Sequence, residues 1–194
     1  MKSFPPSSSL ARLIVTRRLS LEPTGFQHLE GMWSATEESL AELEPWMMWA
    51  AEATLEQTRN FVQRAEKMWD STHADEWTFT IVLRGAPIGT VGLAGARQDF
   101  RRAELGYWLR SDLAGQGYMT EAASAAVAFA FDDVGLHRLE LHAAEGNDAS
   151  MRVAEKLGFR REGLARHAGF GGGNWQDMVV YGLLSTDPRP TFHA

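Results

Sequence analysis

Hydrophobic and polar residues follow two different periods along this chain. Alternation at every second position is typical of a strand that buries one face, and an apolar residue at every third or fourth position is typical of a helix. The first pattern predicts strands at 13–21, 77–83, 88–94, 103–109, 137–143, 159–164 and 178–184. The second predicts helices at 24–34, 54–69, 120–134 and 147–157. This order is typical of a mixed α/β domain built on one sheet.

The predicted strand at 103–109 has one apolar face and one face that carries chemistry. Side chains of a strand alternate between its two faces, so Glu104 and Trp108 share one face and Leu105 and Leu109 share the other. The carboxylate of this strand therefore lies on the same face as a large aromatic side chain.

Composition places the chain among ordinary globular proteins, with 44% hydrophobic and 23% charged residues. Its 194 residues suit a single domain, 1–194, in which 1–10 form a loose lead-in and 185–194 a loose tail. No apolar run approaches the ~20 residues of a membrane span, and the N-terminus lacks the apolar region of a secretory signal. We therefore expect a cytoplasmic protein with no membrane contact.

Charge and cysteine content narrow the function classes. Cysteine is absent, which excludes disulfides, thiolate metal ligands and a cysteine nucleophile. The formal net charge is −6, from 19 basic and 25 acidic residues, which argues against a nucleic-acid partner. Negative charge favours cationic partners such as amines, with simple solubility as the alternative explanation.

The segment Gly115–Thr120 joins a predicted strand to a predicted helix. Gly115 and Gly117 let the backbone approach a ligand closely, and the helix that follows presents unpaired N–H groups and the positive end of its dipole. Together these predict an anion site suited to a pyrophosphate. The alternative is a plain turn. The segment lacks the Gly-Lys-Ser/Thr ending of a P-loop and the third glycine of a dinucleotide-binding fingerprint.

Four segments in order resemble the GNAT superfamily of N-acetyltransferases, and within it the RimJ/RimL-like branch that acetylates ribosomal-protein N-termini. Ala114–Met119 is similar to the cofactor loop, Ala103–Leu109 to the strand before it, and Leu43–Ala50 to the substrate-side segment. Asn147–Ser150, followed by Glu155–Phe159, is similar to a second cofactor segment. The resemblance spans roughly residues 12 to 184.

The resemblance implies a single mixed, largely antiparallel sheet of six to seven strands, with helices on both faces and a splayed central cleft. It implies acetyl-coenzyme A as acyl donor, no metal, and a primary amine as acceptor, either a peptide N-terminus or a small molecule. It also implies that the protein can form a homodimer. The implied cofactor-binding residues are Trp108, Leu109, Ala114, Gly115, Gln116, Gly117, Tyr118, Met119, Thr120, Asn147 and Lys156. Ala114 and Met119 depart from the motif, so backbone amides are expected to grip the cofactor.

Glu104 and Ser150 are the implied catalytic residues. Glu104 stands where many members carry a glutamate that deprotonates the amine through water; the alternative is an exposed glutamate or an ion-pair partner of Arg101 or Arg102. Ser150 would donate a hydrogen bond to the departing thiolate. Asn147 and Ser150 have a competing role as helix caps, and Lys156 a competing role as a solvated lysine.

The implied substrate-binding residues are Trp46, Met47 and Trp49. The indoles of the two tryptophans, with Glu42 and Glu44 nearby, suit a cation. The alternative is a buried contact between helices. The glycine-rich loop 169–173 lacks a carboxylate that some members carry there. His137 and His142 have odd spacing on one strand, so we expect structural or surface histidines that face opposite sides.

Two other functions remain open from the sequence. The chain could be a coenzyme A-binding sensor without turnover, or it could transfer another acyl group such as succinyl. A nucleotide-binding module is a third and weaker interpretation.

Overall fold

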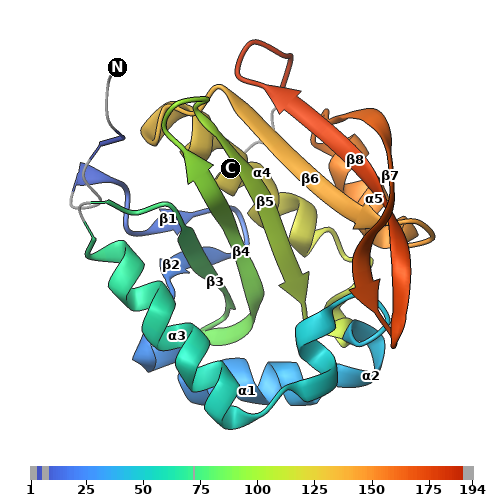
Figure 1. Ribbon diagram of the computed structural model, residues 1–194. Helices are drawn as coiled ribbons and strands as arrows, with labels where there is room; N and C mark the ends of the chain where they lie inside the picture. Colours follow the sequence, from blue (N-terminus) through green and yellow to red (C-terminus); the bar gives the residue numbers. More distant parts are fainter. Residues whose placement is uncertain (1–3, 6–8, 72, 190–194) are drawn as a thin grey trace.

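The structure, a computed structural model, describes residues 4–5, 9–71 and 73–189 (Figure 1). The predicted loose ends 1–10 and 185–194 lie partly outside these residues. Within them the strands form one eight-stranded sheet. The strands, in sheet order, are β1 (Ile14–Val15), β2 (Ser20–Pro23), β3 (Trp77–Leu83), β4 (Ala86–Arg97), β5 (Arg102–Leu109), β6 (Arg138–Ala144), β8 (Asn174–Leu184) and β7 (Arg160–Gly171). All described neighbours are antiparallel except β5 and β6, which are parallel.

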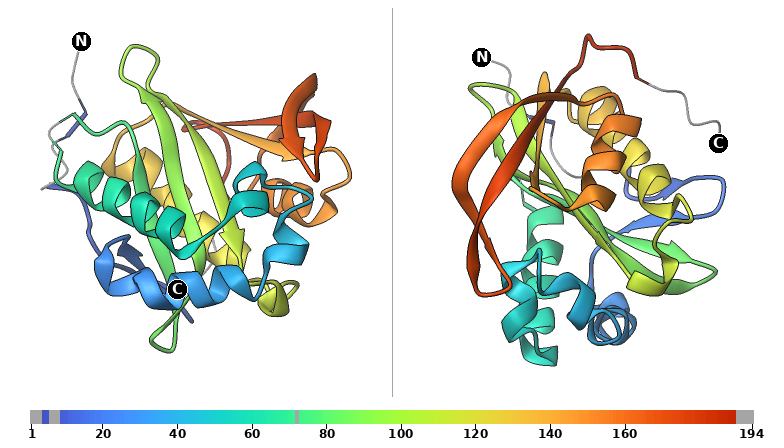
Figure 2. Two further views of the ribbon diagram at one scale, coloured as in Figure 1. Left: turned by 60° about the horizontal axis from the view of Figure 1, so that its bottom comes forward. Right: turned by 90° about the vertical axis from the view of Figure 1, so that its right-hand side faces the viewer.

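Helices cover both faces of this sheet, so the predicted fold class is confirmed. The helices of one face, with the turns that flank them, are η2 (Phe26–His28), α1 (Leu29–Glu37), α2 (Leu40–Leu43), η3 (Met48–Glu52) and α3 (Leu55–Trp69). Those that follow β5 are η4 (Ser111–Leu113), α4 (Tyr118–Ala128), the π-helical turn η5 (Phe129–Asp133) and α5 (Asp148–Lys156). The right-hand view of Figure 2 shows α1 and α3 on one side of the central strands and α4 and α5 on the other.

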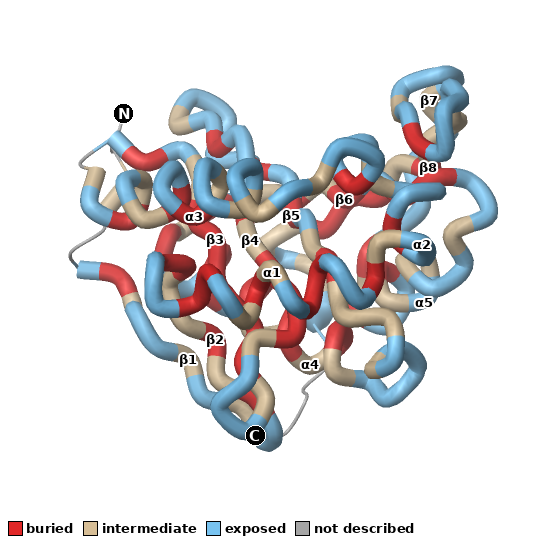
Figure 3. The backbone as a smooth tube through the Cα atoms, turned by 90° about the horizontal axis from the view of Figure 1, so that it is seen from below, coloured by how far each residue is buried: buried red, intermediate tan, exposed pale blue. Residues whose placement is uncertain are grey.

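The buried residues form two hydrophobic clusters, one on each side of the central strands. The larger joins the sheet to α4 and η5, where Phe79 and Phe129 meet edge to face with ring centroids 5.1 Å apart. The smaller joins α1 and α3 to the sheet through Met32, Val62 and Trp108. In Figure 3 the buried stretches run along the central strands, while the outer part of β7 is exposed.

The first predicted strand, 13–21, is wrong in its continuity, which explains why the sheet has eight strands rather than six to seven. A tight turn divides it, because the Thr16 N–H donates to the Leu19 carbonyl and the Leu19 N–H donates to the Thr16 hydroxyl. The helix predicted at 24–34 begins later than expected, because η2 starts at Phe26. The Thr24 side chain is buried against Thr80 at 2.9 Å and caps no helix.

The predicted glycine-rich loop at 169–173 is mostly strand. β7 extends to Gly171 and β8 starts at Asn174, so only Gly172 and Gly173 make the turn, both at positive φ. Two bulges bend the hairpin, which stands out from the sheet at the right of Figure 1. Glycines that are typical of a loop in the sequence therefore lie within the strand and the tight turn of a long, twisted hairpin.

The one parallel pairing described, between β5 and β6, is short. It covers Arg102 with Arg138, Ala103 with Leu139 and Glu104 with Glu140. Beyond this point β5 continues to Leu109 and β6 to Ala144 without pairing each other, so the two strands diverge. This divergence is the splay that the resemblance implies.

Trp69 is predicted to contribute strongly to stability, because it is 1% exposed and its indole N–H donates to the Thr78 carbonyl at 2.8 Å. Replacing it by alanine leaves a cavity and removes this buried hydrogen bond, although the Thr78 carbonyl keeps the Thr24 N–H as a donor. We therefore expect Trp69→Ala to lower the free energy of unfolding by about 3–5 kcal/mol in urea titrations. Trp175→Ala is the matched control, because Trp175 is 65% exposed; its effect should stay within about 0.5 kcal/mol. Equal losses in the two variants would contradict this assignment.

Candidate active site

A cavity of about 1240 Å³ opens on the α1 and α3 side of the diverging strands. Its floor is formed by β4, β5 and β6, and its walls by η3 and α3 on one side and by the β7–β8 hairpin on the other. Seven of the predicted site residues line it: Trp46, Met47, Trp49, Glu104, Trp108, Asn147 and Ser150. The tertiary structure thus brings together the predicted catalytic and substrate-side residues from three distant parts of the chain.

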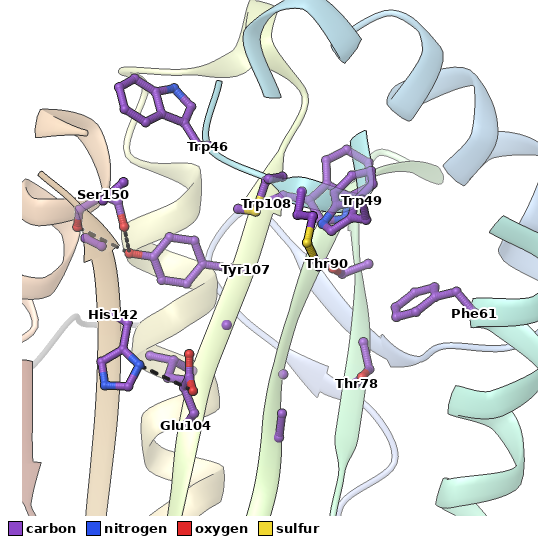
Figure 4. A pocket seen from close by; sticks show the side chains of 18 of the residues that line it. Trp46, Trp49, Phe61, Thr78, Thr90, Glu104, Tyr107, Trp108, His142 and Ser150 are labelled. Carbon is purple, nitrogen blue, oxygen red and sulfur yellow. Dashed lines mark hydrogen bonds and ion pairs between the residues drawn. The ribbon is translucent and has the colours of Figure 1, made fainter. Parts of the chain in front are cut away.

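The aromatic residues divide between core and cavity mouth. Trp108 is 9% exposed and packs in the smaller cluster, while Trp49 is 42% exposed and meets it edge to face at 5.9 Å between ring centroids (Figure 4). Trp46 and Met48 are exposed nearby. Trp46, Met47 and Trp49 thus line the cavity, and their contact with a substrate stays a prediction. Glu42 and Glu44 do not line it, whereas Glu52 does.

The tip of the β7–β8 hairpin is fixed to the segment that leads into η3. The Gly172 N–H donates to the Glu44 carbonyl at 2.9 Å, and the Gln176 side chain donates to the Pro45 carbonyl at 2.6 Å. At Gly171 any side chain would collide with the backbone of Pro45. Glycine is therefore needed where the two walls of the cavity join.

Glu104 stands at the point where β5 and β6 separate, and its partner is His142 of β6. Glu104 Oε2 lies 3.5 Å from His142 Nδ1, and both side chains line the cavity (Figure 4). The hydrogen bond to Glu104, against the opposing effect of partial burial, raises the pKa of His142. The predicted alternative pairing with Arg101 or Arg102 is wrong: Arg102 pairs with Glu140 at 3.3 Å, and Arg101 donates to the Gly135 carbonyl.

His142 is a site residue that the sequence pattern missed. We expected a structural or surface histidine, and the period of a strand gives only the face on which a residue lies. It does not reveal that β6 is the parallel neighbour of β5, which places His142 beside Glu104.

Ser150 and Tyr107 form a hydroxyl pair on the opposite face of β5. Their oxygens are 3.0 Å apart, and the Tyr107 hydroxyl also donates to the Ser150 carbonyl at 3.3 Å. Burial raises the pKa of Tyr107 to about 12, so the phenol keeps its proton at neutral pH. Asn147 Oδ1 accepts from the Ser150 N–H at 3.1 Å, which shows that Asn147 caps α5. The Ser150 hydroxyl is directed to Tyr107 and not to the helix end.

The loop Gly115–Thr120 lies beyond the cavity, at the end of β5. Gly115 and Gly117 have φ of 76° and 81°, a region that glycine enters without strain, and α4 begins directly after Gly117. The first-turn N–H groups of α4 are thus available to an anion. Met119 and Thr120 are each 8% exposed, so their side chains offer little surface to a ligand.

Arg18, from the turn between β1 and β2, holds this loop in place and was not expected from the sequence. Its guanidinium donates to the Gln116 carbonyl at 3.0 Å and to Glu121 at 2.7 Å, and it lies 4.2 Å from the centre of the Tyr118 ring. The Thr16 hydroxyl also donates to Glu121 at 2.7 Å. Burial opposes ionisation of Glu121, but these hydrogen bonds outweigh it and lower the pKa of that carboxyl.

The remaining predicted cofactor residues are distributed around these features. Leu109 is half-buried at the end of β5, Ala114 and Gln116 are exposed in the loop, and Lys156 is exposed in the last turn of α5. Their cofactor contacts stay predictions. Among the described residues no group of three or more His, Asp or Glu side chains could hold a metal ion. No helix in the same part of the chain is long and apolar enough to cross a membrane.

Comparison with known proteins identifies relatives of this architecture. A family model described as acetyltransferase (GNAT) domain matches residues 18–160. The putative ribosomal N-acetyltransferase YdaF of Bacillus subtilis is 35% identical over 107 residues, which cover 55% of this chain and 58% of YdaF. The probable N-acetyltransferase YjcK of the same organism is 42% identical over 101 residues, covering 52% and 56%. The match therefore spans little more than half of these curated relatives.

A solved structure shares the fold over nearly its whole length. RimL, a ribosomal L7/L12 alpha-N-protein acetyltransferase in complex with coenzyme A, superposes with a TM-score of 0.82. Its sequence is 22% identical, and the alignment covers 88% of this chain and 96% of RimL. At this identity the likeness supports the fold alone.

The contact between Arg18 and Glu121 generates a prediction about stability and pH. A carboxyl whose pKa is lowered by folding stabilises the protein above its unfolded pKa, about 4.3 for Glu, and this contribution is lost as pH falls through the lowered folded value. We expect Glu121→Gln to cost about 1 kcal/mol at pH 7. In urea titrations the gap from the natural protein should close below about pH 4.

Glu56→Gln serves as the control, because Glu56 is exposed on α3 and, within the described part of the chain, pairs only with Arg59 at 3.5 Å. Its unfolding free energy should stay within about 0.5 kcal/mol of that of the natural protein at both pH values, since only an exposed pair and a weak interaction with the helix dipole are lost. A pH-independent gap for Glu121→Gln would show that the carboxylate charge is not what holds the loop.

Proposed function

Since this chain belongs to the acetyltransferase (GNAT) domain family, we propose that it transfers the acetyl group of acetyl-coenzyme A to a primary amine, namely the N-terminal amine of a protein. The observation that carries this proposal is the divergence of β5 and β6 after Glu104, with an anion-binding loop beyond the end of β5 and a wide cavity over the point of divergence. A thioester and an amine can meet there from opposite sides.

Binding of the cofactor is proposed to rest on backbone groups. Past Glu104 the edge of β5 that faces β6 no longer pairs with it, so its N–H and C=O groups can bond the amides of an extended pantetheine arm. The glycine loop and the start of α4 would hold the pyrophosphate. The burial of Met119 and Thr120 supports this division, because their side chains offer a ligand little surface to contact.

Three groups would supply the chemistry of acyl transfer. Glu104, at the point of divergence, accepts a proton from the amine, and a backbone N–H of β5 polarises the thioester carbonyl. Ser150 donates a hydrogen bond to the departing sulfur. Tyr107 supports this role, because its phenol keeps its proton and can turn that hydrogen from the Ser150 carbonyl to Ser150 Oγ, which leaves the serine hydrogen free for the thiolate.

A protein N-terminus is favoured over a polyamine by the charges of the cavity. Among the described lining residues the carboxylates are Glu52 and Glu104 only. A polyamine carries several ammonium groups and would gain from several carboxylates, whereas a peptide N-terminus carries one ammonium followed by an uncharged backbone. The exposed aromatics Trp46, Trp49 and Phe170 at the mouth offer contact area to such a chain.

The proposal is tested by measuring thiol release from acetyl-coenzyme A with peptides, spermidine and an aminoglycoside as acceptors. We expect release with peptides that have a free N-terminus and none with the same peptides after N-acetylation. Turnover of the small amines alone would replace the peptide proposal by a small-molecule one. Binding of acetyl-coenzyme A without thiol release across the panel would instead support a sensor.

The glycine loop generates a prediction about cofactor affinity. Valine at position 117 would have to adopt a left-handed conformation, which costs about 1–2 kcal/mol. We expect Gly117→Val to weaken acetyl-coenzyme A binding by at least about tenfold in calorimetry. The loop would then change its conformation, and its backbone N–H groups would no longer point toward the cofactor.

The control for this prediction is Gln116→Ala, which removes an exposed side chain and leaves the backbone free to keep its conformation. Its affinity should stay within about twofold of that of the natural protein. A large loss in this variant would mean that side chains, rather than backbone amides, hold the cofactor.

A further inference from the structure

The position of His142 follows from the register of the parallel strands. Glu104 is opposite Glu140 in the last β5–β6 pair, and His142 lies two residues beyond Glu140 on the same face of β6. The side chains of Glu104 and His142 therefore meet across the first unpaired position of the cleft. Figure 4 shows both directed into the cavity, with Nδ1 of the imidazole toward the carboxylate.

The surroundings of His142 leave Glu104 as its effective partner. The charged groups that act on the imidazole are Glu104 from β5 and Glu140 from its own strand. Glu140 is already held by Arg138 at 3.0 Å and by Arg102 at 3.3 Å. On its other side, β8 places the uncharged Val180 opposite His142.

We propose that Glu104 and His142 form one proton-accepting unit, in which Glu104 meets the acceptor amine and His142 is the positioning residue that receives the proton from it. This inference rests on the proposed acetyltransferase function. A lone carboxylate has ordinary basicity far below that of an amine, and an imidazole behind it provides a better final site for the proton. The 3.5 Å contact and the shared cavity place the two groups in reach of each other.

The step balances without any further reactant. The ammonium loses one proton through Glu104 to Nδ1 of neutral His142, and the freed nitrogen lone pair forms the C–N bond to the thioester carbon. The C–S bond breaks with its electron pair on sulfur, and the second proton of the nitrogen passes to the thiolate. His142 then returns its proton to solvent.

The pH dependence follows from the sign of the histidine shift. Because Glu104 raises the pKa of His142, the neutral, proton-accepting imidazole predominates only above that raised value. Turnover at saturating substrates should therefore fall as pH drops through the pKa of His142. Glutamine in place of His142 keeps a donor for Glu104 but cannot titrate in this range.

The experiment measures kcat against pH for the natural protein, His142→Gln and Glu104→Gln, with a peptide acceptor. We expect His142→Gln to lower kcat by about 100-fold and to remove the acidic limb of the profile, with unchanged acetyl-coenzyme A affinity. His137→Gln is the control, because His137 is exposed, bonds Ser185 at 3.2 Å and does not line the cavity. Its profile should match that of the natural protein.

A second readout is independent of turnover. NMR titration of the imidazole resonances, with His142 assigned by the signal missing in His142→Gln, should give a higher midpoint in the natural protein than in Glu104→Gln. Equal midpoints, or a His142→Gln profile identical to that of the natural protein, would overturn this inference alone. Failure of the natural protein to release thiol with any amine would overturn the proposed function and this inference with it.

Discussion

The parallel pairing of β5 with β6 stops after three residue pairs, and the rest of the site depends on where it stops. All other strand pairs that the structure describes are antiparallel. The pairs of β5 with β4 and of β6 with β8 hold the sheet together while its centre opens. Where the two strands separate, the N–H and C=O groups along their facing edges lose their partners. Such unpaired groups cost free energy inside a protein unless a ligand or water forms hydrogen bonds with them. A gap of this kind in the middle of a sheet is thus itself a binding feature.

Two elements far apart in the sequence turn that gap into an enclosed space. The hairpin of β7 and β8 reaches over one side, and its tip is bonded to the Glu44 and Pro45 carbonyls at the start of the opposite wall. On the other side, Trp108 packs with Met32 and Val62, so the floor of the cavity is also the small hydrophobic cluster. Trp108 therefore both packs in the smaller cluster and lines the cavity, and it supports the exposed Trp49 at the opening.

The two faces of β5 divide the chemistry. Glu104 and Tyr107 both line the cavity, but Glu104 has a basic partner on β6 and Tyr107 has a hydroxyl partner on α5. Arg18 provides a comparable support at the far end of the strand, where it fixes the loop through a carbonyl and a carboxylate. Each group proposed to contact a reactant is thus held by a second group behind it, which limits the rearrangement needed when substrates arrive.

The sequence by itself determined the elements and their faces. The period-two pattern of 103–109 placed Glu104 and Trp108 on one face of a strand, and an apolar stripe indicated the helix 55–69. Gly115 and Gly117 indicated a loop whose backbone can approach a ligand. The resemblance to N-acetyltransferases depended on these segments. Such signals are local, because they arise from the geometry of one strand, helix or turn.

Only the tertiary structure decided which elements are neighbours and in which register. It paired Glu104 with His142 rather than with Arg102, directed Ser150 to Tyr107, and brought Arg18 to a loop about a hundred positions away. It also showed that Met119 points into the core. A period gives the face of a residue but not the strand beside it, and long-range register is set by how all the buried surfaces pack together.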